Sequence, residues 1–269
     1  MKRVIFAILC LNLCGLAARA DSVMPIERQR ELLNEGLNNF DQAMEQAAQH
    51  TGDPDALYRR SVGAFETLAS GGVRSPALEY NLGNTYFRLG ELGKAIVHYR
   101  RGLRLAPTDF DLNENLNYTR NRVEPFIQPT GTQRLLERLL FWTNRTSVAE
   151  RYRMTLYASI AGWLGLLIRL RYRARPLLVI SCLVIVFALA NAGSIAWQIH
   201  EEHSKPPAVV VNGQHILRLG RGEGYDPALN QPLGPGVEVR ILSERADWAE
   251  IQLADGKTGW LPSSAIERI

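Results

Sequence analysis

The amino-acid sequence predicts a multidomain fold with an all-α N-terminal part, two transmembrane helices and a small all-β C-terminal barrel. Three observations lead to this prediction. Residues 21–125 have a helical pattern with few strand signals. Residues 154–168 and 176–199 carry no charged side chain. From residue 208 onward, short strand-like runs alternate with Gly, Pro, Asp and Asn, which is typical of a small barrel.

Residues 1–20 have the pattern of a secretory signal peptide. Lys2 and Arg3 precede the apolar run 4–13, and the small residues at 18 and 20 form a cleavage motif. We expect cleavage after Ala20, with an uncleaved anchor as the alternative. The region that follows is therefore expected outside the cytoplasm.

The placement of the basic residues argues against a nucleic-acid partner. Three of the 31 bases lie in the first twenty residues and four more are Arg169, Arg171, Arg173 and Arg175, so 24 bases face the 27 acids elsewhere. The parts expected outside the membrane are mildly acidic, whereas nucleic-acid binding requires a basic face. Only Cys182, within an apolar run, remains after the signal peptide, so a disulfide is not expected.

The four arginines also predict the orientation of the chain. They flank and fill residues 171–175, between the predicted spans 154–170 and 176–199. Short Arg-rich loops stay on the cytoplasmic side, so 171–175 is predicted to be a cytoplasmic loop. Both remaining parts then lie on the outer side of the membrane, and the chain is expected to cross the membrane twice.

Two connecting segments complete the predicted organisation. Residues 126–153 are expected to form a linker with an amphipathic helix at 133–142, which lies on the membrane surface or packs before the first span. Residues 200–207 are polar and contain two prolines, and we expect a stiff linker there.

Within 21–125, residues 75–109 contain a helix-pair pattern with small and aromatic residues at fixed spacing. This pattern resembles the tetratricopeptide repeat, on six positions in one register: Leu82, Gly83, Tyr86, Ala95, Tyr99 and Pro107. Glu79 and Gly102 depart from it. A degenerate helix pair is expected upstream at 27–48 and 55–70, with Phe65 placed like Tyr99, and a capping helix at 109–122. A single repeat cannot bury its own face, so we expect one and a half to two and a half repeats.

The segment 208–269 resembles bacterial SH3-like domains. The positions that carry this resemblance are Gly222, Gly224, Tyr225, Gly236, Val237, Asp247, Trp248, Asp255, Gly256 and the run 259–262. Asp255-Gly256 lies between two strand-like runs and predicts a hairpin turn.

The combination of signal peptide, short repeat domain, two spans and SH3-like domain resembles BatE-like proteins of bacterial aerotolerance (Bat) operons. That resemblance implies a multi-pass scaffold of the bacterial inner membrane, with its N-terminal and C-terminal domains in the periplasm. It also implies an association with von Willebrand A-domain membrane proteins and a MoxR-type ATPase.

Two sets of residues are candidates for partner binding. In the repeat, the resemblance places Tyr80, Asn84, Phe87 and Arg88 on a concave groove, although Tyr80 and Phe87 could instead pack on the upstream helix. In the barrel, the aromatic side chains of Tyr225, Trp248 and Trp260 could hold a peptide or a peptidoglycan strand. The alternative is that both tryptophans are core residues.

We expect neither a catalytic site nor a cofactor-binding site in this chain. His200 and His203 are three residues apart, whereas the zinc motif H-E-x-x-H requires four. The glycines at 220, 222 and 224 lack the following helix of a phosphate-binding loop. The sequence therefore predicts a scaffold or adaptor without enzyme activity, cofactor or metal, and the alternative function is a cell-wall-binding or envelope-sensing module.

Overall fold

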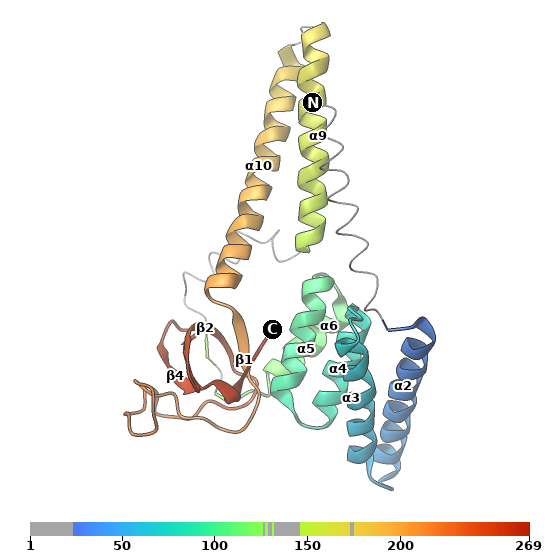
Figure 1. The fold of residues 1–269 in the computed structure, drawn as a ribbon, viewed down its shortest axis with the longest axis vertical. Coiled ribbons are helices and arrows are strands. Elements are labelled where there is room, and N and C mark those ends of the chain that lie inside the picture. Colours follow the sequence, from blue (N-terminus) through green and yellow to red (C-terminus); the bar gives the residue numbers. More distant parts are fainter. Residues whose placement is uncertain (1–23, 126, 129–130, 132–145, 173–174) are drawn as a thin grey trace. The chain divides into compact units, whose positions relative to one another are not determined.

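The computed structural model describes residues 24–125, 127, 128, 131, 146–172 and 175–269. Its helices and a five-stranded sheet are shown in Figure 1. The predictions for the signal peptide (1–20), for the amphipathic helix (133–142) and for Arg173 lie outside the described residues. The described chain divides into two compact units, one ending at Gly90 and one beginning at Glu91.

The first unit contains the helices α2 (Ile26–Gln49), α3 (Pro54–Ser70) and α4 (Pro76–Arg88). The helices α2 and α3 approach closely at Gly36, where a Cβ atom would lie 2.4 Å from the ring of Phe65. The hydroxyl of Ser61 donates a hydrogen bond of 2.8 Å to the main-chain oxygen of Gly36. Phe65 is fully buried, as predicted from its similarity to Tyr99.

Local sequence determines where the helices begin. Asp53 caps α3 by accepting a hydrogen bond from the N–H of Ala56, and Pro54 follows at the first helical position. Asp109 caps α6 (Phe110–Arg120) through the N–H of Leu112 in the same way. The predicted upstream helix pair and the predicted capping helix are therefore confirmed.

The second unit begins with α5 (Leu92–Leu105), followed by α6. Ala95 and Tyr99 are buried, as are Leu112 and Leu116 on the inward face of α6. From α2 to α6 the chain forms five helices, and the number of repeats stays a prediction.

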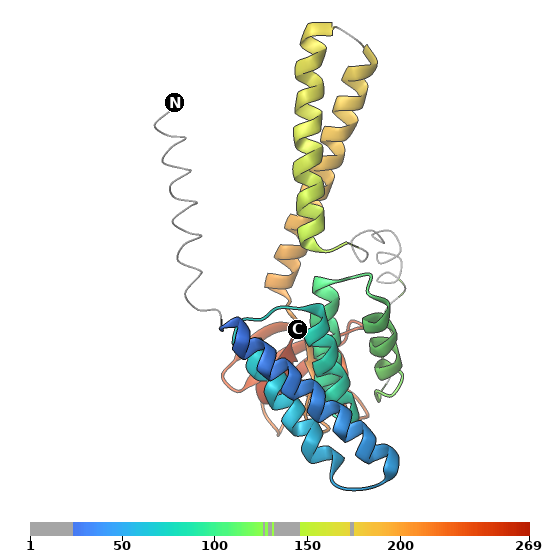
Figure 2. The ribbon, with the colours of Figure 1, turned by 90° about the vertical axis from the view of Figure 1, so that its right-hand side faces the viewer.

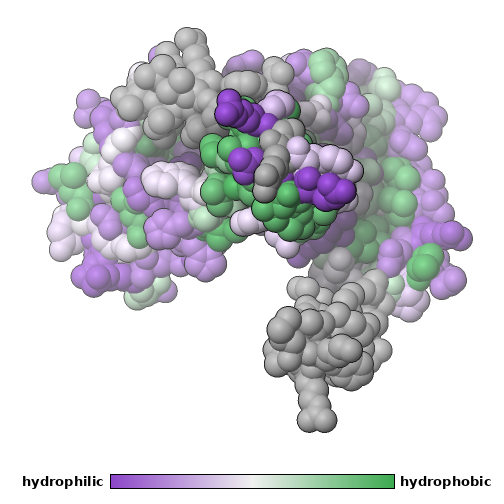
Figure 3. Space-filling view, turned by 90° about the horizontal axis from the view of Figure 1, so that it is seen from above, coloured by the Kyte–Doolittle hydropathy of each residue, from purple (hydrophilic) through white to green (hydrophobic). Residues whose placement is uncertain are grey.

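Two long antiparallel helices follow, α9 (Val148–Tyr172) and α10 (Arg175–Ser204), and they pack side by side in Figures 1 and 2. We call them the α9–α10 hairpin. Small residues allow close packing: a Cβ on Gly162 would lie 2.6 Å from the side chain of Ile185, and one on Gly165 would lie 2.2 Å from Oγ of Ser181. Figure 3, viewed from the tip of the hairpin, shows hydrophobic residues gathered around it and hydrophilic ones at its end.

Among the described residues, α10 is the one helix that is long and apolar enough to cross a membrane. The arginines near both ends of α9 limit its uncharged run to residues 154–168. The prediction of two transmembrane helices is therefore not confirmed, and the first span stays a prediction.

The connections of the hairpin differ from those predicted. Residues 171, 172 and 175 of the predicted loop 171–175 are helical, because arginine favours helices and Pro176 is tolerated in the first turn of α10. The predicted linker 200–207 is helical as far as Ser204. Glu201 and Glu202 extend α10 because they accept hydrogen bonds from Trp197 and Gln198, four residues earlier.

The C-terminal sheet contains β1 (Pro207–Val210), β2 (Glu238–Arg245), β3 (Trp248–Leu253), β4 (Thr258–Pro262) and β5 (Ile266–Arg268). The strand order is β4-β3-β2-β1-β5, and every pair is antiparallel. Its inner face is apolar, with Val209, Ile251 and Leu261 fully buried. Gly256 has a φ of +89° in the predicted turn, a conformation that glycine tolerates best.

Helix α5 packs against the edge of the sheet formed by β1 and β5. Gly93 makes this possible, because a Cβ there would lie 2.4 Å from the main-chain oxygen of Val210. On the next turn, a Cβ on Gly236 would lie 3.2 Å from the side chain of Ile96. Segments on either side of the α9–α10 hairpin in sequence thus form one packed unit.

Candidate binding surfaces

The four predicted residues of α4 lie on one face of that helix, because their spacing of four, three and one follows the helical repeat. Tyr80, Asn84 and Phe87 are half-buried and Arg88 is exposed. The positive charge of Arg88 also reaches α3: burial raises the pKa of Tyr58, and the charge of Arg88 opposes this rise. The face is therefore partly accessible, and it lies beside α3.

The two predicted tryptophans of the barrel lie on the outer face of the sheet. Along β3 and β4 the buried positions alternate with half-buried ones, and Trp248 and Trp260 occupy the half-buried set. Trp260 is opposite Glu250 and Trp248 is opposite Pro262, so the two rings are diagonal neighbours on one face. Neither tryptophan is a core residue, which corrects the alternative that assigned both to the core.

The long loop between β1 and β2 places further side chains at this face. The guanidinium of Arg221 lies 5.6 Å from the ring centroid of Trp260, within the range of a cation–π contact. Arg218 pairs with the main chain of Trp260, and its side chain donates a hydrogen bond of 2.8 Å to the main-chain oxygen of Tyr225. Tyr225 is 55% exposed and covers Gly220, where a Cβ would lie 2.5 Å from the ring. We call Arg221, Tyr225, Trp248 and Trp260 the aromatic face.

A second surface joins residues that are far apart in sequence. The carboxylate of Glu238 in β2 binds two guanidinium groups: Arg100 Nε lies 3.0 Å from Oε2, and Arg120 Nε lies 2.6 Å from Oε1. The side chain of Glu238 is 25% exposed, and those of Arg100 and Arg120 are 41% and 35% exposed. One carboxylate is thus shared between α5 and α6.

The electrostatics of this cluster favour the ionised carboxylate. Burial alone would raise the pKa of Glu238, but the charges of Arg100 and Arg120, and the hydrogen bonds that both donate, outweigh it and hold this pKa below its usual range. Burial lowers the pKa of Arg100, and Glu238 opposes that shift. Arginine remains charged at physiological pH in any case.

These three residues line a cleft of about 410 Å³, which we call the arginine cleft. Its other walls are mostly apolar and come from the segment after α6, from β1, β2 and β3, and from residues next to these strands, including Val123, Val237 and Leu253. Arg240 also lines the cleft, and it is paired with Glu201 at 3.0 Å.

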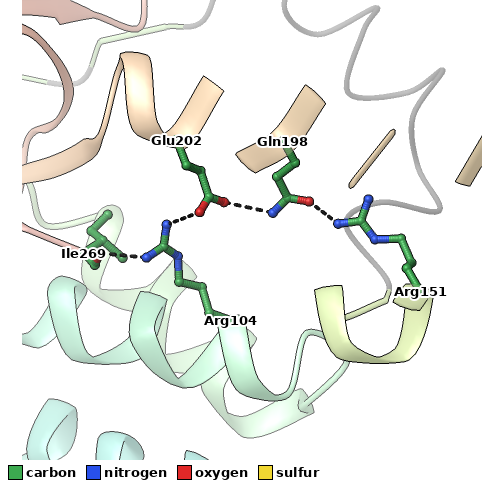
Figure 4. A network of polar contacts seen from close by, with 5 residues as sticks. All are labelled: Arg104, Arg151, Gln198, Glu202 and Ile269. Carbon is green, nitrogen blue, oxygen red and sulfur yellow. Dashed lines mark hydrogen bonds and ion pairs between the residues drawn. The ribbon is translucent and has the colours of Figure 1, made fainter. Parts of the chain in front are cut away.

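A chain of polar contacts links the base of the hairpin to α5 (Figure 4). Arg151 in α9 is 1% exposed and donates to Gln198 in α10. Gln198 donates to Glu202 at 2.8 Å, and Arg104 donates to Glu202 at 2.9 Å. Arg104 also donates to the main-chain oxygen of Ile269 at 2.7 Å, so this network joins α5, α9, α10 and the residue after β5.

Neither the ion cluster nor this network was predicted, because the sequence offers no local signal for them. Arg120 and Glu238 are 118 positions apart, and Arg104 and Glu202 are 98 apart. In the part of the chain that the structure describes, no group of three or more His, Cys, Asp or Glu side chains could hold a metal ion. His200 is exposed, and its ring lies 3.5 Å from the hydroxyl of Ser204.

Comparison with known families gives two matches. The tetratricopeptide repeat family matches residues 76–109, and a family described as the bacterial dipeptidyl-peptidase Sh3 domain matches residues 234–266. No curated protein matches the chain. Both predicted domain types are confirmed, and the resemblance to BatE-like proteins stays a prediction.

Proposed function

We propose that this chain is a two-span adaptor of the bacterial inner membrane, whose repeat and SH3-like domains both face the periplasm and hold partner proteins together. The observation that carries this proposal is the packing of α5 against β1 and β5. Segments that pack together occupy the same side of a membrane. The intervening chain must therefore cross the membrane an even number of times.

The composition of the hairpin supports two crossings. Helix α10 is able to cross by length and composition, so an even count needs a second crossing, for which α9 is the candidate. The exposed large side chains of α9 are apolar along most of its length, including Tyr157, Trp163 and Leu167. A contiguous apolar surface of this kind favours a lipid environment. The arginines at the tip of the hairpin favour the cytoplasmic side for that end.

The two domain types support a binding function. Tetratricopeptide repeats and SH3-like domains mediate interactions with proteins or with the cell wall, and the α4 face and the aromatic face are accessible surfaces for such contacts. A Bat-type stress complex, with von Willebrand A-domain membrane proteins as partners, is the specific assembly that the resemblance suggests.

The adaptor proposal is tested by crosslinking in intact cells, solubilisation of the membranes and recovery of the full chain with its partners. We expect defined membrane partners to be recovered with the wild-type chain, and their recovery to fall at least several-fold with Phe87→Ala combined with Arg88→Ala. Arg74→Ala is the matched control, because Arg74 is exposed and lies outside α4. If no partner is recovered, or if all three chains recover it equally, the α4 face is not the docking surface.

The aromatic face supports a second function, which is binding of peptidoglycan. Exposed tryptophan and tyrosine rings stack on sugars and peptides at low entropic cost. The full chain in detergent micelles is then expected to sediment with purified cell walls, and Trp260→Ala to reduce the bound fraction. Tyr118→Ala, at an exposed aromatic residue of α6, is the control. Equal sedimentation of both variants would exclude the aromatic face.

A further inference from the structure

We propose that the arginine cleft is a binding site for the carboxylate of a peptide, distinct from both the α4 face and the aromatic face. The charge balance of the cleft is the first argument. Two guanidinium groups share the single carboxylate of Glu238, which leaves one positive charge uncompensated at that point. The carboxylate of a bound peptide would neutralise this positive charge.

The hydrogen-bonding capacity of the arginines is the second argument. Each guanidinium has five N–H donors, and both arginines contact Glu238 through Nε. Within the residues that the structure describes, no further partner is found for the Nη groups of Arg100 or Arg120. The side chains of both arginines remain more than a third exposed, and the planar fork of a guanidinium matches an incoming carboxylate.

The neighbouring charged side chains are paired with one another and do not cancel this surplus. The main-chain oxygen of Ile269, which also lines the cleft, is bound by Arg104 at 2.7 Å. Arg240 also lines the cleft, but Glu201 binds it at 3.0 Å. Arg101 and Arg104 in α5 are paired with Glu267 and Glu202, each at 2.9 Å. The positive charge is therefore concentrated where Arg100 and Arg120 meet Glu238.

The apolar walls favour a peptide over a small inorganic anion. Val123, Val237 and Leu253 surround the charged cluster with aliphatic surface, which offers contacts to a side chain next to a carboxylate. The volume of about 410 Å³ lies in the range of small-ligand sites. A phosphate ion would use the arginines and leave these walls without a partner.

The test uses the full chain in uncharged detergent micelles and an N-acetylated Ala-Val-Ala-Leu peptide with a free C-terminal carboxylate. Titration calorimetry measures its affinity, together with that of the same peptide amidated at its C-terminus and of inorganic phosphate. We expect saturable binding of the carboxylate peptide, and binding at least tenfold weaker for the amidated peptide and for phosphate. The comparison of the two peptides requires no variant of the protein.

Variants then identify the site. Arg120→Gln and Arg100→Gln are each expected to weaken the carboxylate peptide at least tenfold. Arg122→Gln is the matched control, because Arg122 is an exposed arginine outside the cleft, two residues from Arg120, and it is expected to leave the affinity unchanged. Circular dichroism confirms that each variant is folded. Absence of saturable binding, equal binding of the amidated peptide, or tighter binding of phosphate would overturn the proposal.

Discussion

Gly93 lies in the first turn of α5, where the helix backbone meets β1. A Cβ there would lie 2.4 Å from the main-chain oxygen of Val210 and 2.7 Å from Cα of Val211, and real Cβ atoms essentially never approach closer than 3.0 Å. Both contacted atoms belong to the backbone, so Gly93→Ala must push α5 and β1 apart by roughly 0.6 Å. The substitution therefore tests the contact between α5 and β1, the segments that precede and follow the hairpin in sequence.

The size of the effect follows from two opposing contributions. Overpacking a tight contact costs about 1–3 kcal/mol. Replacing glycine by alanine in a helix contributes up to about 1 kcal/mol of stability. We expect a net loss of about 1–2 kcal/mol. The matched control is Gly63→Ala in α3, where a Cβ meets nothing within 4 Å, and there a gain of about 0.5–1 kcal/mol is expected.

The assay is hydrogen exchange of the full chain in micelles, followed by mass spectrometry of peptides from β1. The N–H of Val210 donates to Val237 and that of Val211 to Ala265, so these amides report opening of the sheet edge. Gly93→Ala is expected to accelerate their exchange by about 5- to 30-fold, since about 1.4 kcal/mol corresponds to a factor of ten. Exchange that matches the wild type in both variants would refute packing of α5 on β1.

Three further predictions concern the charged clusters and the hairpin. Because the pKa of Glu238 is depressed, its stabilising contribution is complete above the ordinary glutamate pKa of about 4.3 and is lost as the pH falls through the lower folded-state value. Melting temperatures of the wild type should therefore fall more steeply in acid than those of Glu238→Gln, and parallel curves would contradict this. Arg104→Ala removes the hydrogen bonds that this partly exposed guanidinium donates to Glu202 and Ile269. We expect the free energy of unfolding, measured by urea titration, to fall by about 1 kcal/mol. An unchanged free energy of unfolding would show that the network in Figure 4 is not stabilising. Gly162→Leu should separate α9 from α10, because a Cβ at Gly162 already meets the side chain of Ile185 at 2.6 Å. Gly193→Leu is the control, because a Cβ at Gly193 meets nothing within 4 Å. Energy transfer between labels on the two helices measures their separation, and equal transfer in both variants would argue against close packing.

The ends of the helices could be predicted because the residues that determine them are local. Asp53 with Pro54, and Asp109, mark the beginnings of α3 and α6 and act through neighbours three residues away. The strands β3 and β4 were similarly predictable from alternating side chains on either side of Asp255-Gly256, where Gly256 adopts a positive φ.

The contacts that join separate segments could not be predicted. The ion pairs of Glu238 with Arg100 and Arg120 connect a residue after the hairpin in sequence with two residues before it. In the sequence alone, each of these charged residues is typical of a solvated surface position. The helical conformation of residues 200–204, within the predicted linker, was missed for a related reason. Polar residues suggested an exposed exit, but Glu201 and Glu202 continue α10, and they also bind the distant residues Arg240 and Arg104.

The candidate binding residues were partly predictable. The outward placement of Trp248 and Trp260 was recognised as one of two alternatives, and the alternation of burial along β3 and β4 decides between them. Arg221 was not predicted as part of the aromatic face, because its approach to Trp260 depends on how the loop between β1 and β2 folds back on β4.

The proposed topology places the segments before and after the α9–α10 hairpin on the same side of the membrane. Reporter fusions at residues 120, 172 and 265 in intact cells test it directly, since each reporter is active on one side only. We expect the reporters at 120 and 265 to be periplasmic and the reporter at 172 to be cytoplasmic. Reporters at 120 and 265 on opposite sides, or a periplasmic reporter at 172, would contradict it.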